Sequence, residues 1–195
     1  INAENPDIVL IAGDVVDNFA KPLFEDKVYK TLRRIKARYG VYMALGNHEY
    51  IGGEIDRNLN FLSQANVQVL RDSATLIDNT FYIIGRDDAS RKYRNSLANI
   101  TDRLDHTKPM IVLDHQPSGF EEAQKCGIDL LLSGHTHGGQ VFPISLVVKA
   151  VFKHSYGYHT ANGTHFYITS GLGIWGGKFR IGSRSEYVVI NLQGR

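Results

Sequence analysis

Residues 8–14 read Ile-Val-Leu-Ile-Ala-Gly-Asp, a continuous apolar run that ends in a glycine and a carboxylate. Such a run without alternation predicts a strand that is covered on both faces, as in a parallel sheet. The same arrangement, an apolar run followed at once by polar residues, recurs over residues 41–49, 110–115 and 129–137. Because the carboxyl ends of parallel strands meet at one edge of a sheet, we expect these polar tips to converge.

The rest of the chain alternates between helical and strand patterns. The periodicity predicts helices over residues 23–38, 54–65, 97–104 and 120–125, and strands over 67–70, 74–77 and 81–84. The last third is rich in glycine, tyrosine and β-branched residues, which predicts strands over 140–142, 155–160, 165–169 and 186–192. Alternating strands and helices that end in a series of strands indicate an α/β fold finished by antiparallel pairing. The apolar stretch 144–152 is expected to pack in the core, with a lid or a membrane-facing segment as alternatives.

Composition limits the classes of partner. A net charge of +2, with basic residues scattered along the chain, gives no reason to expect a nucleic-acid polymer. The single cysteine, Cys126, excludes an internal disulfide. No apolar run approaches the roughly 18–20 residues that a membrane-spanning helix needs. Residues 1–6 lack an initiator methionine and read like the tail of a helix, so we expect a natural N-terminus further upstream.

The polar tips supply one aspartate, one asparagine and four histidines from distant parts of the chain. These residues are Asp14, Asn47, His48, His115, His135 and His137. Neutral imidazoles beside a carboxylate suit Zn, Mn and Fe. Two such ions about 3.5–4 Å apart clamp the attacking and leaving oxygens of a phosphate ester. The sequence therefore predicts a binuclear metal site.

The motifs also resemble a known superfamily. Gly13-Asp14-Val15-Val16-Asp17, Gly46-Asn47-His48-Glu49, His115 and Gly134-His135-Thr136-His137 follow the order and spacing of the calcineurin-like metallophosphoesterases. Residues 133–141 and 170–176 are similar to the bacterial branch of membrane-associated, YkuE- and YaeI-like phosphodiesterases. The resemblance covers nearly the whole chain. It implies a single domain over residues 1–195, folded as a four-layer α-β-β-α sandwich.

The resemblance implies a role for each metal ligand. Asp14 would bridge two divalent ions, which Mn, Fe or Zn could provide. Asn47, His115 and His135 would complete the shell of one ion. His137 would belong to the other.

It likewise implies catalytic residues that are not ligands. His48 would protonate the leaving oxygen or hold the phosphate, and Asp17 would orient His48. Glu49 is expected to support His48 or a nearby water, and Asp114 to be a structural or outer-shell carboxylate. Arg180 follows a glycine-rich turn and is a candidate to bind the substrate phosphate with its guanidinium, a surface ion pair or a packed loop being the alternative.

One motif of the superfamily is missing. Its members begin with an Asp-x-His motif on the first strand, and both residues bind the ion that His137 serves. No such motif precedes Gly13 in this chain. We therefore expect an N-terminally truncated domain whose first strand lies upstream. If nothing lay upstream, the site would hold one metal or be inactive.

The implied reaction is hydrolysis of a phosphate monoester or diester by a hydroxide that bridges the metals. Two alternatives stay open: a pyrophosphohydrolase acting on a nucleotide-linked lipid precursor, and a binding scaffold that keeps the fold without the activity. The expected partner is a phosphate-ester substrate. Resemblance alone implies that the full-length protein associates with a membrane.

Overall fold

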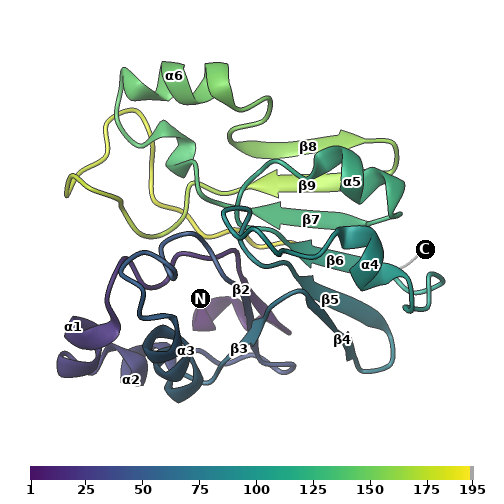
Figure 1. The fold of residues 1–195 in the computed structure, drawn as a ribbon, viewed down its shortest axis with the longest axis horizontal. Helices are drawn as coiled ribbons and strands as arrows, with labels where there is room; N and C mark the ends of the chain where they lie inside the picture. Colours follow the sequence, from purple (N-terminus) through teal and green to yellow (C-terminus); the bar gives the residue numbers. More distant parts are fainter. Residues whose placement is uncertain (194–195) are drawn as a thin grey trace.

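The computed structural model describes residues 1–193 and contains two β-sheets that face each other (Figure 1). The first sheet has three parallel strands in the order β1-β2-β3: β1 (Val9–Ile11), β2 (Val41–Ala44) and β3 (Val67–Leu70). The second has six strands in the order β4-β5-β6-β7-β9-β8: β4 (Ser73–Ile77), β5 (Phe81–Gly85), β6 (Met110–Leu113), β7 (Leu130–Ser133), β8 (Gly157–Ala161) and β9 (Thr164–Ile168). Its inner strands are parallel, and the edge strands β4 and β8 are antiparallel to their neighbours.

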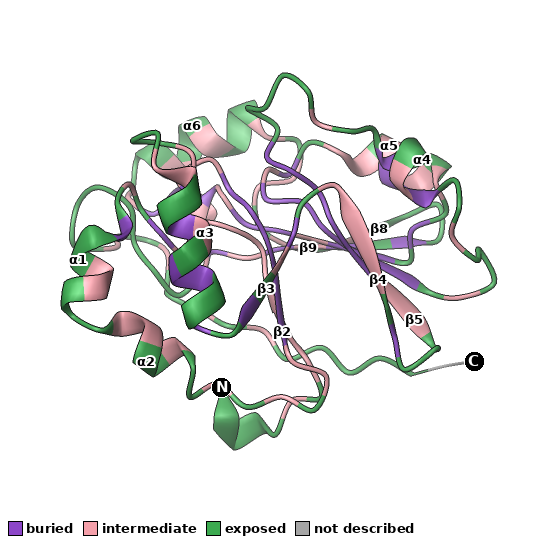
Figure 2. Cartoon of the chain, turned by 60° about the horizontal axis from the view of Figure 1, so that its bottom comes forward, coloured by how far each residue is buried: buried purple, intermediate pink, exposed green. Residues whose placement is uncertain are grey.

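Helices cover the outer face of each sheet. Those on the first sheet are α1 (Ala20–Glu25), α2 (Val28–Leu32) and α3 (Ile55–Gln64), and those on the second are α4 (Leu97–Thr101) and α5 (Phe120–Lys125). Two short 3-10 helices, η1 (Asn2–Glu4) and η2 (His137–Gly139), and the helix α6 (Ile144–Val151) complete the described elements. Figure 2 shows buried residues running along the strands and on the sides of the helices that face them.

The alternation of side chains along β2 explains the layers. Val41 and Met43 pack against the helices, whereas Tyr42 and Ala44 pack against the second sheet. Both faces of β2 are buried, as its unbroken apolar run predicts. Apolar clusters thus lie under each helix layer and between the sheets, which confirms the α/β fold and the four-layer order of helices and sheets.

Three predicted elements differ in the structure. The helix predicted over residues 23–38 is two helices, because Lys27 adopts a left-handed conformation (φ 53°) between them. The segment 140–142 is not a strand; Val141 makes only an isolated bridge with Ile181. The segment 186–192 pairs with no strand of the described chain. In neither case does a strand within residues 1–193 extend the pairing beyond these contacts.

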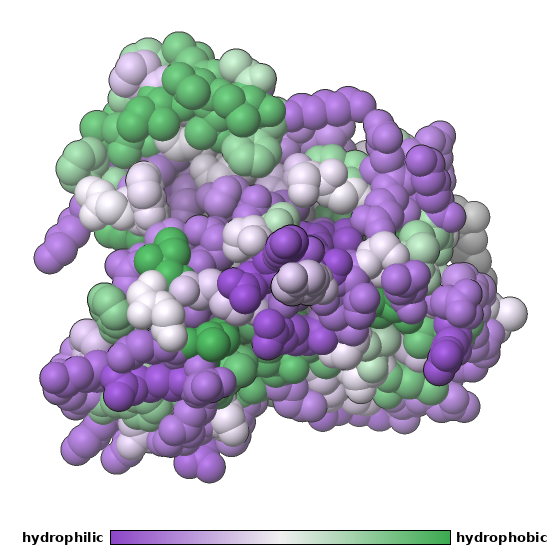
Figure 3. Space-filling model, viewed as in Figure 1, coloured by the Kyte–Doolittle hydropathy of each residue, from purple (hydrophilic) through white to green (hydrophobic). Residues whose placement is uncertain are grey.

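The expectation that residues 144–152 pack in the core is wrong. No residue of α6 is buried, and Val147 and Val151 are 61% and 70% exposed. Figure 3 shows the resulting apolar patch, which lies over α6 at the top left of the view. Among residues 1–193, no helix combines the length and the apolar character needed to cross a bilayer.

Candidate metal centre

Four strand tips meet where the carboxyl ends of the two sheets come together. Asp14 follows β1 and Asn47 follows β2 of the first sheet, while His115 follows β6 and His135 follows β7 of the second. Possible ligand atoms of Asp14, His115 and His135 all lie within 4.8 Å of one another. The convergence predicted from the sequence is therefore present.

His115 lies at the middle of this group. Its Nδ1 is 2.6 Å from the carbonyl oxygen of Ala12, which accepts a hydrogen bond and so assigns the donor N–H to Nδ1. The other nitrogen, Nε2, is 2.9 Å from Oδ2 of Asp14. Nε2 is also 3.2 Å from Oδ1 of Asn47 and 3.2 Å from Nδ1 of His135. A carbonyl oxygen that accepts from one ring nitrogen commonly orients a histidine whose other nitrogen binds a metal.

The atoms around Nε2 of His115 fit a divalent cation. The carboxylate of Asp14 and the amide oxygen of Asn47 present lone pairs, and a neutral His135 can do the same. A single proton on Nε2 can satisfy only one of these neighbours at a time, whereas a cation satisfies all of them. Two imidazoles, a carboxylate and an amide oxygen form a donor set suited to Zn, Mn or Fe.

Burial and the contact between Asp14 and His115 determine how the pKa values in this group are shifted. Burial lowers the pKa of His115, but the hydrogen bond and charge of Asp14 outweigh it, so the pKa is raised overall. Burial raises the pKa of Asp14, but His115 outweighs it and the pKa is lowered overall. Burial and then the charge of His115 lower the pKa of His135. His135 therefore favours the neutral form that a metal ligand requires.

His137 lies beside this group without joining it. Its Nδ1 is buried and has no hydrogen-bond partner among the described residues. Burial, followed by the charge of Arg180, lowers its pKa, which favours a neutral ring. A buried, unpaired imidazole nitrogen costs free energy unless something binds it. The structure thus places His137 near the cluster but does not join it to the three closely spaced ligands.

The strand tips need unusual backbone conformations. Asp14, His135 and His137 all have positive φ angles, of 57°, 66° and 51°. Residues other than glycine adopt this region at a cost of about 1–3 kcal/mol each, and they concentrate at functional sites. Gly46 permits the close approach, because a Cβ atom there would lie 2.1 Å from Oδ1 of Asp14.

Glu49 holds the first two tips together. Its carboxylate is fully buried and accepts four backbone N–H groups, at distances of 2.7–3.0 Å. The donors are Asp14, Val15, Val16 and Gly46. Glu49 therefore holds the backbone of the two tips, whereas the sequence analysis expects it to support His48 or a water. Nothing in the motif reveals this, because the four donors come from two separate strands.

His48 and Asp17 lie together at the rim of the centre. Nδ1 of His48 is 2.7 Å from Oδ1 of Asp17 and 2.8 Å from its carbonyl oxygen. Both contacts use the same ring nitrogen, and Nε2 of His48 makes no hydrogen bond within residues 1–193. The backbone N–H of His48 donates to Oδ1 of Asp14 at 3.0 Å, so the loop also positions the carboxylate.

Arg180 contacts the protein rather than open space. Its two terminal nitrogens donate to the carbonyl oxygens of His137, Ser170, Gly171 and Gly173 and to the hydroxyl of Ser183. The guanidinium thereby fixes the backbone behind His137 to the loop that follows β9. A contact between Arg180 and phosphate stays a prediction, and it would require these bonds to rearrange.

A buried polar layer supports the second sheet's tips. Asp114 is almost fully buried and pairs with Arg86 at 3.3 Å and with Arg94, so its predicted structural character is confirmed. Asp88 is fully buried and accepts two bonds from the amide of Gln116, at 3.0 and 3.1 Å. The sequence did not indicate Asp88, because the loop 86–95 reads only as polar.

Several known proteins are similar to this chain in sequence. The sequence profile of the calcineurin-like phosphoesterase family matches residues 1–139. An uncharacterized metallophosphoesterase of Campylobacter jejuni is 36% identical over 100% of this chain and 53% of its own length. The transmembrane protein with metallophosphoesterase domain of Danio rerio is 31% identical over 99% of the chain and 47% of its own length. The uncharacterized metallophosphoesterase YkuE of Bacillus subtilis is 28% identical over 99% and 70%.

A 5'-nucleotidase precursor from Thermus thermophilus has a similar fold, with a TM-score of 0.52 and 16% identity over 83% of this chain and 39% of that chain. The chain spans about half the length of several curated relatives that it matches. The profile match, the relatives and the order of the four strand tips agree: the chain belongs to the calcineurin-like phosphoesterase family.

Proposed function

We propose that the protein hydrolyses phosphate esters with two divalent metal ions bound at the strand tips. The family consists of metal-dependent phosphoesterases, and the observation that carries the proposal is the convergence of Asp14, Asn47 and His135 on Nε2 of His115. Bound divalent ions would supply an activated water and neutralise charge on the phosphate. Asp14, Asn47, His115 and His135 would hold one ion, and His137, with Asp14 as the bridge, would contribute to the other.

The remaining residues would handle the proton and the substrate. His48 projects from the loop after β2 with Nε2 free, and Asp17 holds its Nδ1. In this arrangement Nε2 would give a proton to the departing alkoxide, a contribution of about 10² to 10⁴ in rate. Asp17 would keep the ring oriented, and Glu49 would keep the tip that carries both His48 and Asp14 in place.

The experiment is metal-dependent hydrolysis by the full-length protein. Bis-p-nitrophenyl phosphate and p-nitrophenyl phosphate would be compared with Mn, Fe and Zn, each against a chelator-treated sample. The proposal would be supported if turnover requires metal, is lost in His135→Ala and is kept in His165→Ala. Metal-bound protein without turnover on either ester would contradict it and favour the binding-scaffold alternative.

We propose further that the full-length protein works at a membrane surface. The relative from Danio rerio is named a transmembrane protein, and the exposed face of α6 is the observation that favours a surface contact here. Its apolar residues are Ile144, Leu146, Val147 and Val151. No Asp or Glu occurs between Asp129 and Glu186, whereas that stretch carries Lys149, Lys153, Lys178, Arg180 and Arg184. An apolar face with basic surroundings suits an anionic lipid surface.

Vesicle binding tests this second proposal. The full-length protein and its Val147→Asp and Leu192→Asp variants would be sedimented with phosphatidylglycerol-phosphatidylcholine vesicles. Leu192 is a matched control because it is 61% exposed but lies in the irregular C-terminal segment. Loss of binding in Val147→Asp alone would support the proposal. Equal binding by all three proteins, or a dimer that Val147→Asp dissociates, would contradict it.

A further inference from the structure

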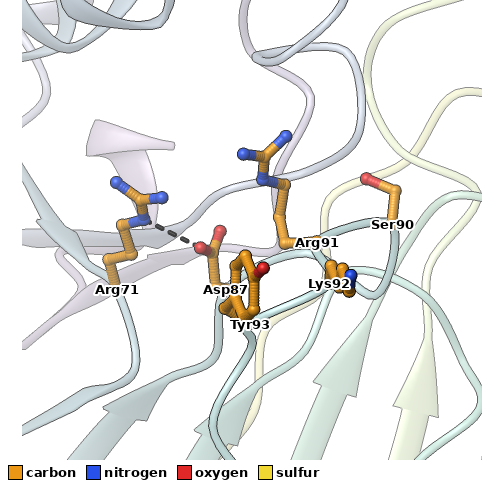
Figure 4. A pocket seen from close by; sticks show the side chains of 6 residues that line it. All are labelled: Arg71, Asp87, Ser90, Arg91, Lys92 and Tyr93. Carbon is orange, nitrogen blue, oxygen red and sulfur yellow. Dashed lines mark hydrogen bonds and ion pairs between the residues drawn. The ribbon is translucent and has the colours of Figure 1, made fainter.

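A basic pocket lies between Arg71, in the turn from β3 to β4, and the loop that joins β5 to α4 (Figure 4). Its volume is about 260 Å³. The residues that line it are Arg71, Asp87, Ser90, Arg91, Lys92 and Tyr93. Three cationic side chains therefore share one small pocket with a single carboxylate.

The carboxylate is already occupied by the protein. Asp87 is 4% exposed, and its Oδ2 accepts a bond of 2.8 Å from Nε of Arg71. Its Oδ1 accepts from the hydroxyl of Tyr50 and from the backbone N–H of Asp88. Asp87 thus fixes the stem of Arg71 through Nε, while the two terminal nitrogens of that guanidinium make no hydrogen bond within the described chain.

The other two cations have no carboxylate partner within residues 1–193. Arg91 stacks over the ring of Tyr50 at 4.5 Å, and Arg71 also lies over that ring, at 5.6 Å. Both guanidinium groups thus lie against one aromatic ring, and both line the pocket. Placing like charges together is unfavourable, and an anion that binds between them relieves the repulsion.

The pocket is close to the metal centre. Tyr50 follows His48 by two residues, so their Cα atoms are at most about 7 Å apart. On the other side, Asp88 follows Asp87 and accepts both bonds from Gln116, the neighbour of His115. Two separate connections therefore tie the pocket to the loops that carry the catalytic imidazole and a metal ligand.

We infer that this pocket binds a second phosphate group of the substrate, remote from the ester that is cleaved. The inference rests on the proposed function, because it assigns the substrate of the same centre. Guanidinium groups match phosphate oxygens through paired N–H donors, and the lysine adds a further charge. The substrate class is then a phosphoester that carries an additional phosphate or pyrophosphate group.

Direct binding is the first test, and it does not need activity. Inorganic pyrophosphate would be titrated into the metal-free full-length protein by calorimetry, with backbone amide shifts followed by NMR. We expect binding with shifts in residues 86–95, weakened about tenfold or more in Arg91→Ala/Lys92→Ala. The matched control is Arg33→Ala/Lys36→Ala, which removes two exposed cations near α2. Three outcomes would overturn the inference: pyrophosphate does not bind, both double variants weaken its binding equally, or only His135→Ala abolishes its binding.

Kinetics provides the second test. The metal-loaded protein would be compared on thymidine 5′-(p-nitrophenyl phosphate) and on the same compound with a 3′-phosphate. We expect a lower KM for the 3′-phosphorylated ester, and Arg91→Ala/Lys92→Ala should remove that preference while kcat on the simpler ester stays unchanged. Hydrolysis of both esters with equal KM, combined with no pyrophosphate binding, would refute the pocket but not the hydrolase. Pyrophosphate binding without any hydrolysis would support the pocket and refute the proposed function.

Discussion

Nε2 of His115 lies 2.9 Å from Oδ2 of Asp14, across the junction between the two sheets. Nδ1 of the same ring donates to Ala12, so a second proton on the ring would sit on Nε2 and face Asp14. That proton would occupy the position that a cation needs. The raised pKa of His115 and the lowered pKa of Asp14 both favour this proton when no metal is bound.

Metal binding should therefore release a proton. His115 has a raised pKa, so its stabilisation of the metal-free fold is full below the ordinary value of about 6.5 and is lost as pH rises through the folded pKa. The lowered pKa of Asp14 gives stabilisation that is present above 3.8 and lost as pH falls through the folded pKa. Calorimetric Mn titrations at about pH 6, in buffers of different ionisation enthalpy, should show about one proton released per ion at this site.

The release should shrink as pH rises past the folded pKa of His115, and apparent affinity should increase over the same range. His165→Ala, a change away from the centre, should leave both trends intact. A titration with no proton release at either end of the range would contradict the assignment of His115.

Asp14→Asn and His48→Ala should separate metal binding from catalysis. Asp14→Asn removes the only carboxylate of the cluster, and we expect the metal content to fall. His48→Ala removes a ring that bonds Asp17 rather than the cluster, so the metals should stay while kcat falls by about 10² or more. Plasma mass spectrometry of both purified variants checks this. Equal metal loss in both would show that His48 is a ligand.

Much of the fold could be predicted because β2, β6 and β7 are largely buried on both faces and β1 is half-buried on both, which makes their sequences unbroken apolar runs. The polar tips lie at the ends of these runs, and the carboxyl ends of parallel strands meet at one edge. The convergence of Asp14, Asn47, His115 and His135 could therefore be predicted as well. Segments whose structure depends on a distant partner were predicted poorly. Residues 140–142 and 186–192 have strand composition but join no strand within residues 1–193, and the apolar residues of α6 have no core to pack against, since none of them is buried.

The support of the centre was harder to predict than its ligands. Glu49 accepts N–H groups from two strand tips, and Asp88 accepts from Gln116 across 28 residues of chain. These roles depend on tertiary contacts and leave no spacing rule in the sequence. The left-handed backbone at Lys27 likewise has no sequence signal, and it divides the predicted helix between Phe24 and Val28, which both pack on the core of the first sheet.

Glu49→Gln should destabilise the metal-free protein. The side-chain NH₂ of glutamine would face one of the backbone N–H groups that now donate to the carboxylate, and the two donors would oppose each other in a fully buried site. We expect the free energy of unfolding to fall by about 2–4 kcal/mol. Urea denaturation of the metal-free chain measures it. Glu54→Gln is the control, because the only side chain that pairs with Glu54 within residues 1–193 is the exposed Arg57. Equal stability of Glu49→Gln and wild type would mean that the four bonds do not hold the tips.

Asp17→Asn should have a smaller effect than His48→Ala. The side chain of Asp17 is 76% exposed, and its own carbonyl oxygen also accepts from the ring of His48. Orientation of the ring is therefore partly kept, and solvent weakens the lost charge. We expect kcat to fall by about 3- to 10-fold with KM and metal content unchanged. A loss as large as that of His48→Ala would show that the carboxylate takes part in the proton transfer itself.

Gly46→Ala should disturb the metal centre through a single methyl group. The added Cβ would lie 2.1 Å from Oδ1 of Asp14 and 2.9 Å from its backbone nitrogen, so the carboxylate must move. Its position is fixed by the N–H of His48 and by the left-handed backbone of Asp14, which leaves little room to adapt. We expect metal affinity to fall at least about tenfold, measured by competition with a chromogenic chelator. Gly173→Ala is the matched control, because a Cβ there meets nothing within 4 Å. If Gly46→Ala bound metal as tightly as Gly173→Ala, the carboxylate of Asp14 could not be a ligand in the position described.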